Sequence, residues 1–292
     1  MGGSQSCVSR IDLACRIVAL EEILEISLSR RNNELALLSL ASWLDVDSSQ
    51  VLHFYREIIE DKEFLKAVSI KIESNIDFKS SIPGLFTKVP IENPDWFGLQ
   101  RILLYCLTRL LKPKIVVETG VYYGGNTAFI LNALDRNGEG QLIAIDLPQS
   151  TMKSEEIAAR HPWVGDSELY DSNFLPGFIV PESLRSRLRL ILGDSKEVLK
   201  GLNQSIDFFV HDSEHTISNV LMEMETVWKK MSTNGMLLVD DIDWSNGFFS
   251  FIVDSHLYPL LLTDNGKDGL RVRTGLVKRD HKNNKLSEVT LI

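Results

Sequence analysis

The most constraining feature of this sequence is a regular alternation of strand-like and helix-like segments between residues 114 and 240. Fully apolar runs such as Phe208-Phe209-Val210 and Met236–Val239 suit strands that are buried on both faces. The segments between them are longer and have apolar residues at helical spacing. Strands separated by such helices predict a parallel sheet with helices on both faces, so we expect a doubly wound α/β fold.

The expected strands and helices can be placed along the chain from this change of period. The strands are expected at Lys114–Glu118, Gln141–Asp146, Leu188–Leu192, Ile206–Val210 and Met236–Asp240. The helices are expected at Trp96–Leu111, Asn126–Leu134, Ser195–Leu202 and Ser218–Met231. Two antiparallel edge strands, Pro259–Leu262 and Leu270–Val277, would complete a mostly parallel sheet of seven strands.

The N-terminal part of the chain has a different character. No Gly or Pro interrupts the sequence between Ser4 and Ile82, and residues 10–77 carry apolar residues near helical spacing. Ser48 or Ser49 is the expected cap of one of these helices. We therefore divide the chain into a helical subdomain and linker, residues 1–94, and an α/β domain, residues 95–292. The subdomain could serve as a cap over the site, as a homodimer surface, or as both.

Composition excludes several classes of function. The net charge is −9 and the chain has no long run of Lys or Arg, which disfavours a nucleic-acid partner. The three cysteines are an odd number without metal-like pairing, as is typical of free thiols in a reducing cytoplasm. No apolar stretch is long enough to span a membrane. Gly2 and Ser6 satisfy a loose myristoylation pattern, which we interpret as chance.

A glycine-containing loop follows the first expected strand of the α/β domain. It reads Glu118-Thr-Gly-Val-Tyr-Tyr-Gly-Gly-Asn126. Gly120 permits a tight turn, and Gly124 lets the backbone approach a ligand without interference from a Cβ atom. The spacing is neither the G-x-G-x-x-G of dinucleotide-binding folds nor a phosphate loop with Gly-Lys-Ser/Thr. In doubly wound sheets, ligands bind beyond the carboxyl ends of the strands, so this loop is the expected binding site.

Acidic residues follow three successive strands of the expected sheet. Glu118 would attract the ammonium of an amino-acid group, and Asp146 would accept bonds from both ribose hydroxyls. Asp194 would accept a bond from an adenine amine. An ammonium, a ribose and an adenine without phosphates describe S-adenosylmethionine, which is the cofactor we expect. The predicted cofactor contacts are Glu118, Gly120, Tyr122, Gly124, Asn126, Asp146, Asp194, Ser195 and Asp212.

These residues resemble the class I S-adenosylmethionine-dependent methyltransferases over about residues 95–278. Two stretches, Phe209–Ile217 and Gly235–Trp244, look like the methyltransferase domain 24 group. That group is similar to small-molecule O-methyltransferases that use a divalent metal, including catechol-type and macrolide-sugar enzymes. The resemblance implies a Rossmann-like methyltransferase fold and a small hydroxylated acceptor, such as a sugar or polyketide of specialised metabolism.

Three carboxylates are expected to converge at the mouth of the sheet. Asp212 ends the fourth expected strand, and Asp240 and Asp241 end the fifth. Clustered carboxylates repel one another unless a cation or protonation relieves them, and their oxygens suit Mg²⁺. His215 stands where the resemblance places the proton acceptor of metal-dependent O-methyltransferases. An imidazole titrates near neutral pH and can take an alcohol proton.

Other functions remain open at this point. Metal-independent transfer to oxygen or nitrogen is one, and a cofactor-binding scaffold without chemistry is another. The stretch Leu147–Arg187 is longer than normal connections and is either a lid or a surface excursion. Asp243 and Trp244 could line the acceptor pocket.

Overall fold

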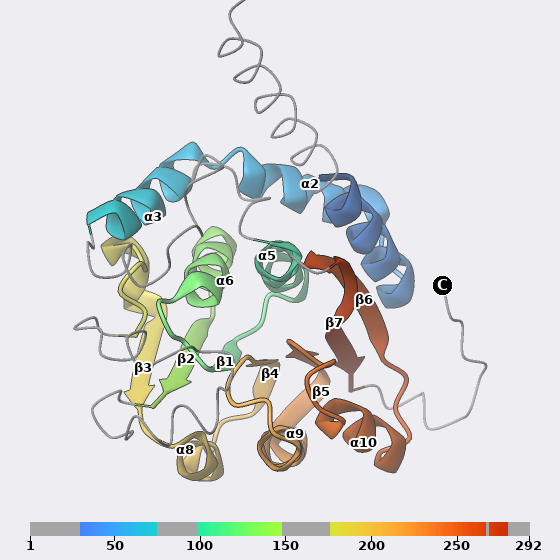
Figure 1. Ribbon diagram of the computed structural model, residues 1–292. Coiled ribbons are helices and arrows are strands. Elements are labelled where there is room, and N and C mark those ends of the chain that lie inside the picture. Colours follow the sequence, from blue (N-terminus) through green and yellow to red (C-terminus); the bar gives the residue numbers. More distant parts are fainter. Residues whose placement is uncertain (1–29, 75–97, 148–175, 267–268, 280–292) are drawn as a thin grey trace, which may run out of the picture.

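The computed structural model describes residues 30–74, 98–147, 176–266 and 269–279. Figure 1 shows a central sheet with helices on both faces. One face is covered by α5 (Leu99–Leu111) and α6 (Gly125–Asn137), and the other by α8 (Ser195–Gly201), α9 (Ile217–Lys230) and α10 (Gly247–Asp254). The doubly wound α/β fold that the alternation predicted is confirmed.

The sheet has seven strands in the order β3-β2-β1-β4-β5-β7-β6. The pairs from β3 to β5 are parallel, and β7 is antiparallel to both β5 and β6. The strands are β1 (Ile115–Thr119), β2 (Gln141–Asp146), β3 (Leu188–Leu192), β4 (Ile206–His211), β5 (Met231–Val239), β6 (Leu260–Gly266) and β7 (Gly269–Lys278). The strand order reverses between β1 and β4, which are neighbours in space but not in sequence.

The two C-terminal strands differ from the expectation in one respect. Both were expected at the edge of the sheet, but β7 lies inside it, between β5 and β6. Leu276 and Val277 are almost fully buried there, because they pack against neighbours on both sides. The helix α10 was not predicted from the sequence. It is short and almost entirely apolar, with Phe248 and Phe251 buried, and such a run lacks the polar face that marks a surface helix.

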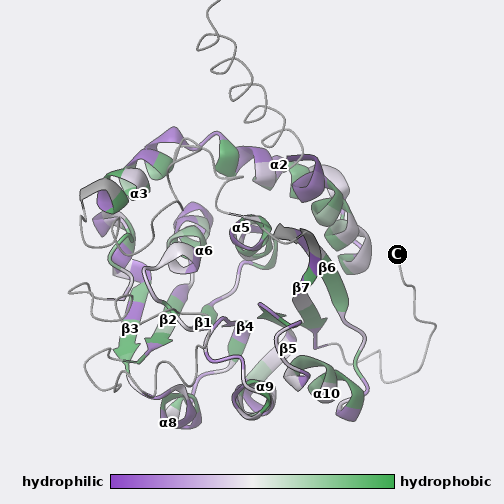
Figure 2. Ribbon diagram, viewed as in Figure 1, coloured by the Kyte–Doolittle hydropathy of each residue, from purple (hydrophilic) through white to green (hydrophobic). Residues whose placement is uncertain are grey.

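The described N-terminal residues form a helical layer over α5 and α6 (Figure 1). They comprise helical residues 30–44, α2 (Ser48–Ile59) and α3 (Lys62–Ser74). Hydrophilic and hydrophobic residues alternate along α2 and α3 in Figure 2, as amphipathic helices require. The helix α2 is capped by Asp47, one residue before the expected serines, and the Asp47 carboxylate accepts a bond from the Ser49 backbone N–H at 2.9 Å.

This layer is joined to α5 and α6 by both charge and packing. The Glu57 carboxylate accepts bonds from the Tyr105 hydroxyl at 2.5 Å and from Nε of Arg109 at 2.7 Å. The rings of Phe64 and Phe129 meet edge to face, with centroids 5.2 Å apart. One hydrophobic cluster runs from α2 and α3 through α5 and α6 to the sheet. The described helices therefore share a core with the α/β domain, while their role as a cap or homodimer surface stays a prediction.

Several predicted features fall outside the described residues. These are the helical pattern before residue 30, the Gly2 signal, the linker at 75–97, and residues 148–175 of the expected lid. Of that stretch the structure describes residues 176–187, which end in a 3₁₀ helix, Glu182–Arg187. Among the described residues, no helix is long and apolar enough to cross a membrane.

Candidate active site

The loop that follows β1 lies where the strand order reverses. The sheet runs β2-β1-β4 at this point, so helices leave β1 and β4 on opposite faces. A crevice at the carboxyl ends of these strands is where open α/β sheets bind ligands. Within the loop, the Gly120 N–H donates to the Ile145 carbonyl on β2, and the Asp212 N–H donates to the Thr119 carbonyl. The loop is thus tied to the strands on both sides of β1.

Two glycines of this loop cannot be replaced without moving their neighbours. Gly120 has φ +83°, and a Cβ atom there would lie 1.9 Å from the backbone oxygen of Asp212. Gly124 has φ +96°, and its Cβ would lie 2.6 Å from Cα of Gly177. Positive φ and these contacts together require glycine at both positions. The sequence predicted the turn at Gly120. At Gly124, the backbone that comes close is that of Gly177 in the same chain.

Asp146 at the end of β2 shapes the same loop. Its Oδ2 accepts bonds from the backbone N–H groups of Val121 at 3.1 Å and Tyr122 at 2.7 Å. Its Oδ1 accepts a bond from the Leu147 N–H at 2.8 Å. These bonds hold Tyr122 at φ 49°, a conformation that residues other than glycine rarely adopt. Burial raises the Asp146 pKa, and the three backbone bonds oppose that rise.

Glu118 at the end of β1 is a buried carboxyl group with unused bonding capacity. Its side chain is completely buried, and Oε2 accepts a bond from the Thr127 hydroxyl at 2.7 Å. Oε1 is also buried, and it has no hydrogen-bond partner among the described residues. Burial, and to a smaller degree the charge of Asp146, raises the pKa of Glu118 to about 8. A buried acceptor without a donor is costly, so this atom fits the ammonium or another donor of a bound ligand.

Asn126 and Asp212 meet across the switch point. The Asn126 side-chain amide donates to Oδ2 of Asp212 at 2.6 Å, and Gln100 lies 3.5 Å from the same oxygen. Oδ1 of Asn126 is buried without a hydrogen-bond partner in the described parts of the chain. Polar atoms without partners thus occur on both Glu118 and Asn126, which supports a polar ligand beside the loop.

Asp194 and Ser195 follow β3 and begin α8. The exposed Asp194 caps that helix, because its Oδ1 accepts a bond from the Lys196 N–H at 2.8 Å. The Gly193 N–H donates to the Asp146 carbonyl at 2.8 Å, which brings the ends of β2 and β3 together. Ser195 donates its hydroxyl to Glu223 at 2.5 Å. The proposed cofactor contacts of Asp194 and Ser195 remain predictions.

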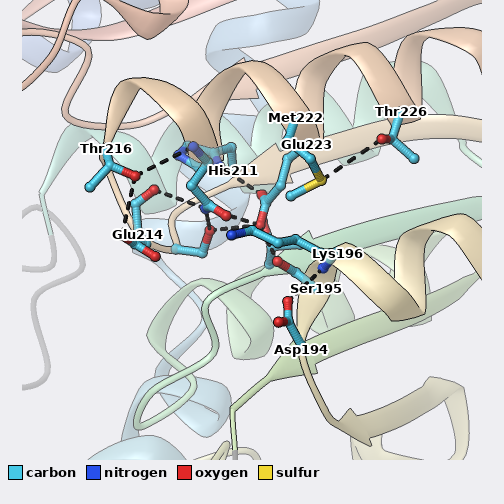
Figure 3. Close-up of polar contacts among 12 residues, drawn as sticks. Asp194, Ser195, Lys196, His211, Glu214, Thr216, Met222, Glu223 and Thr226 are labelled. Atoms are coloured by element: carbon cyan, nitrogen blue, oxygen red, sulfur yellow. Dashed lines mark hydrogen bonds and ion pairs between the residues drawn. The ribbon is translucent and has the colours of Figure 1, made fainter. Parts of the chain in front are cut away.

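Glu223 on α9 is a buried carboxylate that sequence reasoning missed. Figure 3 shows its side chain beside those of His211 and Ser195. Its oxygens lie 2.6 Å from the Thr119 hydroxyl, 2.9 Å from the Ser213 hydroxyl and 2.8 Å from Nδ1 of His211. Although burial raises its pKa, the charge and hydrogen bond of His211 and further donors produce a net lowering. The available signal was its position four residues from Asn219 and Val227, on the inward face of an amphipathic helix.

His215 is partly exposed and lies between two aromatic rings. Its ring centroid is 5.3 Å from that of His211 and 5.1 Å from that of Trp244. His211 is fully buried and is held by Glu223, so it supports one side of His215. The indole of Trp244 supports the other side and remains 36% exposed. The predicted proton acceptor therefore stands at the surface of the site with a restricted orientation.

The three carboxylates expected to bind a metal follow two neighbouring strands, Asp212 after β4 and Asp240 and Asp241 after β5. Burial and the negative charges of Asp240 and Asp241 raise the pKa of Asp212 well above its usual range. Burial and the charge of Asp241 raise the pKa of Asp240 to about 7. Like charges in a buried site disfavour the ionised form of each of these carboxyl groups.

Arg273 on β7 already provides a cation to this group. Its Nε donates to Oδ1 of Asp241 at 2.7 Å, and one terminal nitrogen lies 2.5 Å from the same oxygen. That nitrogen is 3.8 Å from Oδ2 of Asp240. Among the described residues, no group of three or more His, Cys, Asp or Glu side chains is arranged to hold a metal ion. Mg²⁺ needs free carboxylate oxygens in octahedral geometry, so this donor set does not fit it while Arg273 stays paired.

Arg101 is a second cation of the site that was not predicted. It lies on α5 and donates to the Tyr123 hydroxyl at 2.6 Å. Its positive charge acts to lower the pKa values of Glu118, Asp212 and Asp240, against the larger effect of burial. A single arginine near the start of an apolar helix was the only signal, and helical spacing alone does not distinguish it from a surface residue.

Comparison with known proteins places the described site inside a recognised domain. Residues 117–242 match the family described as a methyltransferase domain, which is less than half of the chain. The match begins in β1 and ends just after Asp241, so it includes the cofactor loop, His215 and the converging carboxylates. No curated protein matches the sequence.

Several solved structures are similar in fold at low identity. A putative O-methyltransferase from Klebsiella pneumoniae is 16% identical, with a TM-score of 0.48 over 73% of this chain and 90% of that chain. The O-methyltransferase TomG from Streptomyces achromogenes, in complex with S-adenosylmethionine, is 15% identical, with a TM-score of 0.49 over 80% and 96% of the two chains. An O-methyltransferase from Bacillus cereus is 12% identical, with a TM-score of 0.48 over 73% and 90%.

Residues 117–242 are therefore a methyltransferase domain, and the seven-stranded sheet with an antiparallel β7 is the Rossmann-like methyltransferase fold expected of class I enzymes. The match agrees with the methyltransferase domain 24 group that the sequence of these residues resembles.

Proposed function

We propose that this chain methylates a hydroxyl group of a small molecule, with His215 as the proton acceptor. The observation that carries the proposal is the position of His215, partly exposed at the switch point and held between the rings of His211 and Trp244. A general base must be restrained in orientation and must reach the substrate, and the two neighbouring rings and partial exposure of this imidazole support that role. The class of acceptor atom, oxygen, is our inference from this base.

The loop residues would hold the cofactor. S-adenosylmethionine supplies a methyl group on a positively charged sulfur. Glu118 offers a buried acceptor, Oε1, toward the ammonium, and Asp146 lies at the end of β2 for the ribose. Gly120 and Gly124 keep the loop in the tight conformation that places these two carboxyl groups beside it. The concentration of carboxylates favours a cationic cofactor over one that carries phosphates.

The chemical step follows from these positions. The acceptor's hydroxyl oxygen forms a bond to the methyl carbon while the carbon–sulfur bond breaks and its electrons remain on sulfur. The imidazole of His215 accepts the hydroxyl proton. Positioning of the two reactants in one orientation provides much of the rate increase in such a displacement.

The acceptor would lie against Trp244. Its indole is an exposed aromatic surface beside the base, and Asp243 on the same loop is fixed by Nε of Arg271 at 2.6 Å. Aromatic faces and charged hydrogen-bonding groups suit a small hydroxylated metabolite, such as a sugar or polyketide. The net charge of −9 supports such a partner over a nucleic acid.

A second form of the proposal includes Mg²⁺, as the sequence predicted. The convergence of Asp212, Asp240 and Asp241 favours it, since bound Mg²⁺ would relieve their repulsion and lower the pKa of an acceptor hydroxyl. The ion pair of Arg273 with Asp241 favours the metal-independent form, which we place first.

The test combines cofactor binding with methyl transfer. Calorimetric titration of S-adenosylmethionine is expected to show binding in the micromolar range, in Mg²⁺ and in EDTA alike. Formation of S-adenosylhomocysteine is then measured with a panel of catechols, hydroxylated sugars and polyketide alcohols, again under both conditions. Absence of cofactor binding by the folded protein would refute the proposal. Activity that EDTA abolishes and Mg²⁺ restores would select the second form.

A further inference from the structure

We propose that Arg273 is the permanent cation of this site, and that it occupies the role which a divalent metal fills in metal-dependent O-methyltransferases. The inference rests on the proposed function, because it concerns the carboxylates beside the predicted acceptor pocket. It also makes a statement about the chain itself: Asp240 and Asp241 reject divalent ions as long as Arg273 is present.

The first support is geometric. Arg273 reaches the two aspartates from β7. This strand pairs with β5 up to Val239, the residue before Asp240. Two of its nitrogens lie within 2.7 Å of one Asp241 oxygen, and one of these nitrogens is 3.8 Å from Asp240. The Arg273 carbonyl also accepts a bond from the Ile242 N–H at 3.0 Å. Side chain and backbone of one residue therefore hold the same loop.

The second support is electrostatic. The side chains of Asp240 and Asp241 are only 7% and 9% exposed, and water cannot screen their repulsion well at this burial. Arg273 is 29% exposed, and a guanidinium stays charged at every accessible pH. It therefore compensates these carboxylates under all conditions, whereas a bound metal would depend on its concentration.

The third support is the neighbouring pair. Arg271, two residues earlier on β7, donates to Asp243 at 2.6 Å. Two guanidinium groups from β7 therefore pair with the acidic loop at residues 240–243. The two arginines of β7 thus carry charges opposite to those of the aspartates that they contact in the loop. A divalent ion that bound Oδ1 of Asp241 would have to displace a bonded guanidinium.

The experiment measures Mn²⁺ binding by electron paramagnetic resonance on the full chain, with and without S-adenosylhomocysteine. The variant Arg273→Met removes the charge and keeps much of the side-chain volume. We expect wild type to bind Mn²⁺ only at millimolar concentrations, and Arg273→Met to bind it at least about tenfold more tightly, as an uncompensated carboxylate pair should. Arg271→Met is the matched control, since it removes a guanidinium from the same strand without freeing Asp241.

Two further variants make the result specific. Arg273→Lys keeps the positive charge and is expected to bind Mn²⁺ as weakly as wild type does. The double variant Arg273→Met/Asp241→Asn is expected to lose the gain, because one of the two carboxylates is gone. Circular dichroism and thermal unfolding confirm that each variant is folded before Mn²⁺ is added.

The outcomes separate this inference from the proposed function. Tight Mn²⁺ binding by wild type that Asp241→Asn abolishes would overturn the inference, even if Arg273→Met failed to fold. A folded Arg273→Met that gains no Mn²⁺ binding would overturn it as well. Neither result depends on methyl transfer. The proposed function fails on a different readout, which is absence of S-adenosylmethionine binding by wild type.

Discussion

Nδ1 of His211 lies 2.8 Å from Oε2 of Glu223, and both side chains are completely buried. This contact joins β4 to α9 directly beneath the site. The same carboxylate accepts bonds from Thr119 at the end of β1 and from Ser195 after β3. One buried group therefore connects the ends of three strands, and His215 rests on the histidine that it holds.

Replacement of Glu223 by Gln is expected to destabilise the fold by about 2–4 kcal/mol, because buried donors lose a charged acceptor. Its lowered pKa means that its contribution is present above the unfolded-state pKa and is lost as pH falls through the folded-state value. Urea unfolding at neutral and acidic pH measures both effects. The exposed Glu225, two residues away on α9, supplies the control Glu225→Gln. Equal stability of the two variants would contradict the role of Glu223.

Glu118 should make the cofactor-free protein less stable as pH rises. Its pKa is raised to about 8 in the folded chain from an ordinary 4.5, so the folded state binds the extra proton between these values. Stability is then greatest below pH 4.5 as far as this group is concerned, and it falls as pH increases toward 8.

The variant Glu118→Gln isolates this effect, since Asp212 and Asp240 contribute with the same sign. We expect a flatter dependence of the free energy of unfolding on pH and a much weaker affinity for S-adenosylmethionine. Denaturant titrations across the pH range and calorimetry provide the two measurements. The exposed Glu139 gives the matched control Glu139→Gln. An unchanged slope in Glu118→Gln would show that other groups determine the pH dependence.

Gly120→Ala should disrupt the cofactor loop. The new Cβ would lie 1.9 Å from the backbone oxygen of Asp212, so the loop or β4 must shift. Loss of cofactor affinity of about tenfold or more is expected, together with about 2 kcal/mol or more of stability. Gly138→Ala is the control, because its φ of +73° carries similar backbone strain with no atom within 4 Å of the added Cβ. The difference between the two variants measures the clash with the backbone of Asp212 and Ser213.

His215→Gln should slow methyl transfer without affecting cofactor affinity. Removal of a general base typically lowers kcat by about 10²–10⁴-fold. The measurement uses the best acceptor from the panel, with kcat followed across pH and S-adenosylmethionine affinity measured by calorimetry. His53→Gln, at an exposed position of α2, serves as the control. A variant with undiminished kcat would remove His215 from the mechanism and leave the base to be found elsewhere.

The strands were predictable because their signal is local. Gln141–Asp146 and Leu188–Leu192 form strands with the expected bounds, and the apolar run of the first is buried as such runs predict. The cofactor loop was predictable for a related reason, as Gly120 adopts a backbone conformation that few other residues tolerate. The placement of Asp212, Asp240 and Asp241 after neighbouring strands followed from the rule that parallel strands end at one edge.

The partners of those carboxylates were not predictable in the same way. Arg273 reaches Asp241 only because β7 inserts between β5 and β6, and antiparallel pairing across a long connection leaves no periodic signal. Glu223 was missed because a carboxylate on the apolar face of a helix looks like a break in the apolar pattern until its hydrogen-bond donors are known. Both residues act through contacts with segments distant in sequence.

The insertion of β7 also gives the site an order of assembly. Asp241 is synthesised 32 residues before the arginine that pairs with it. A nascent chain that has formed β1 through β5 therefore has Asp241 at an open edge of the sheet without its Arg273 partner. Only when the last described strand docks along β5 does the charge of the pocket reach its final value. Folding of this C-terminal segment is thus the step that brings the positive charge of Arg273 to Asp241.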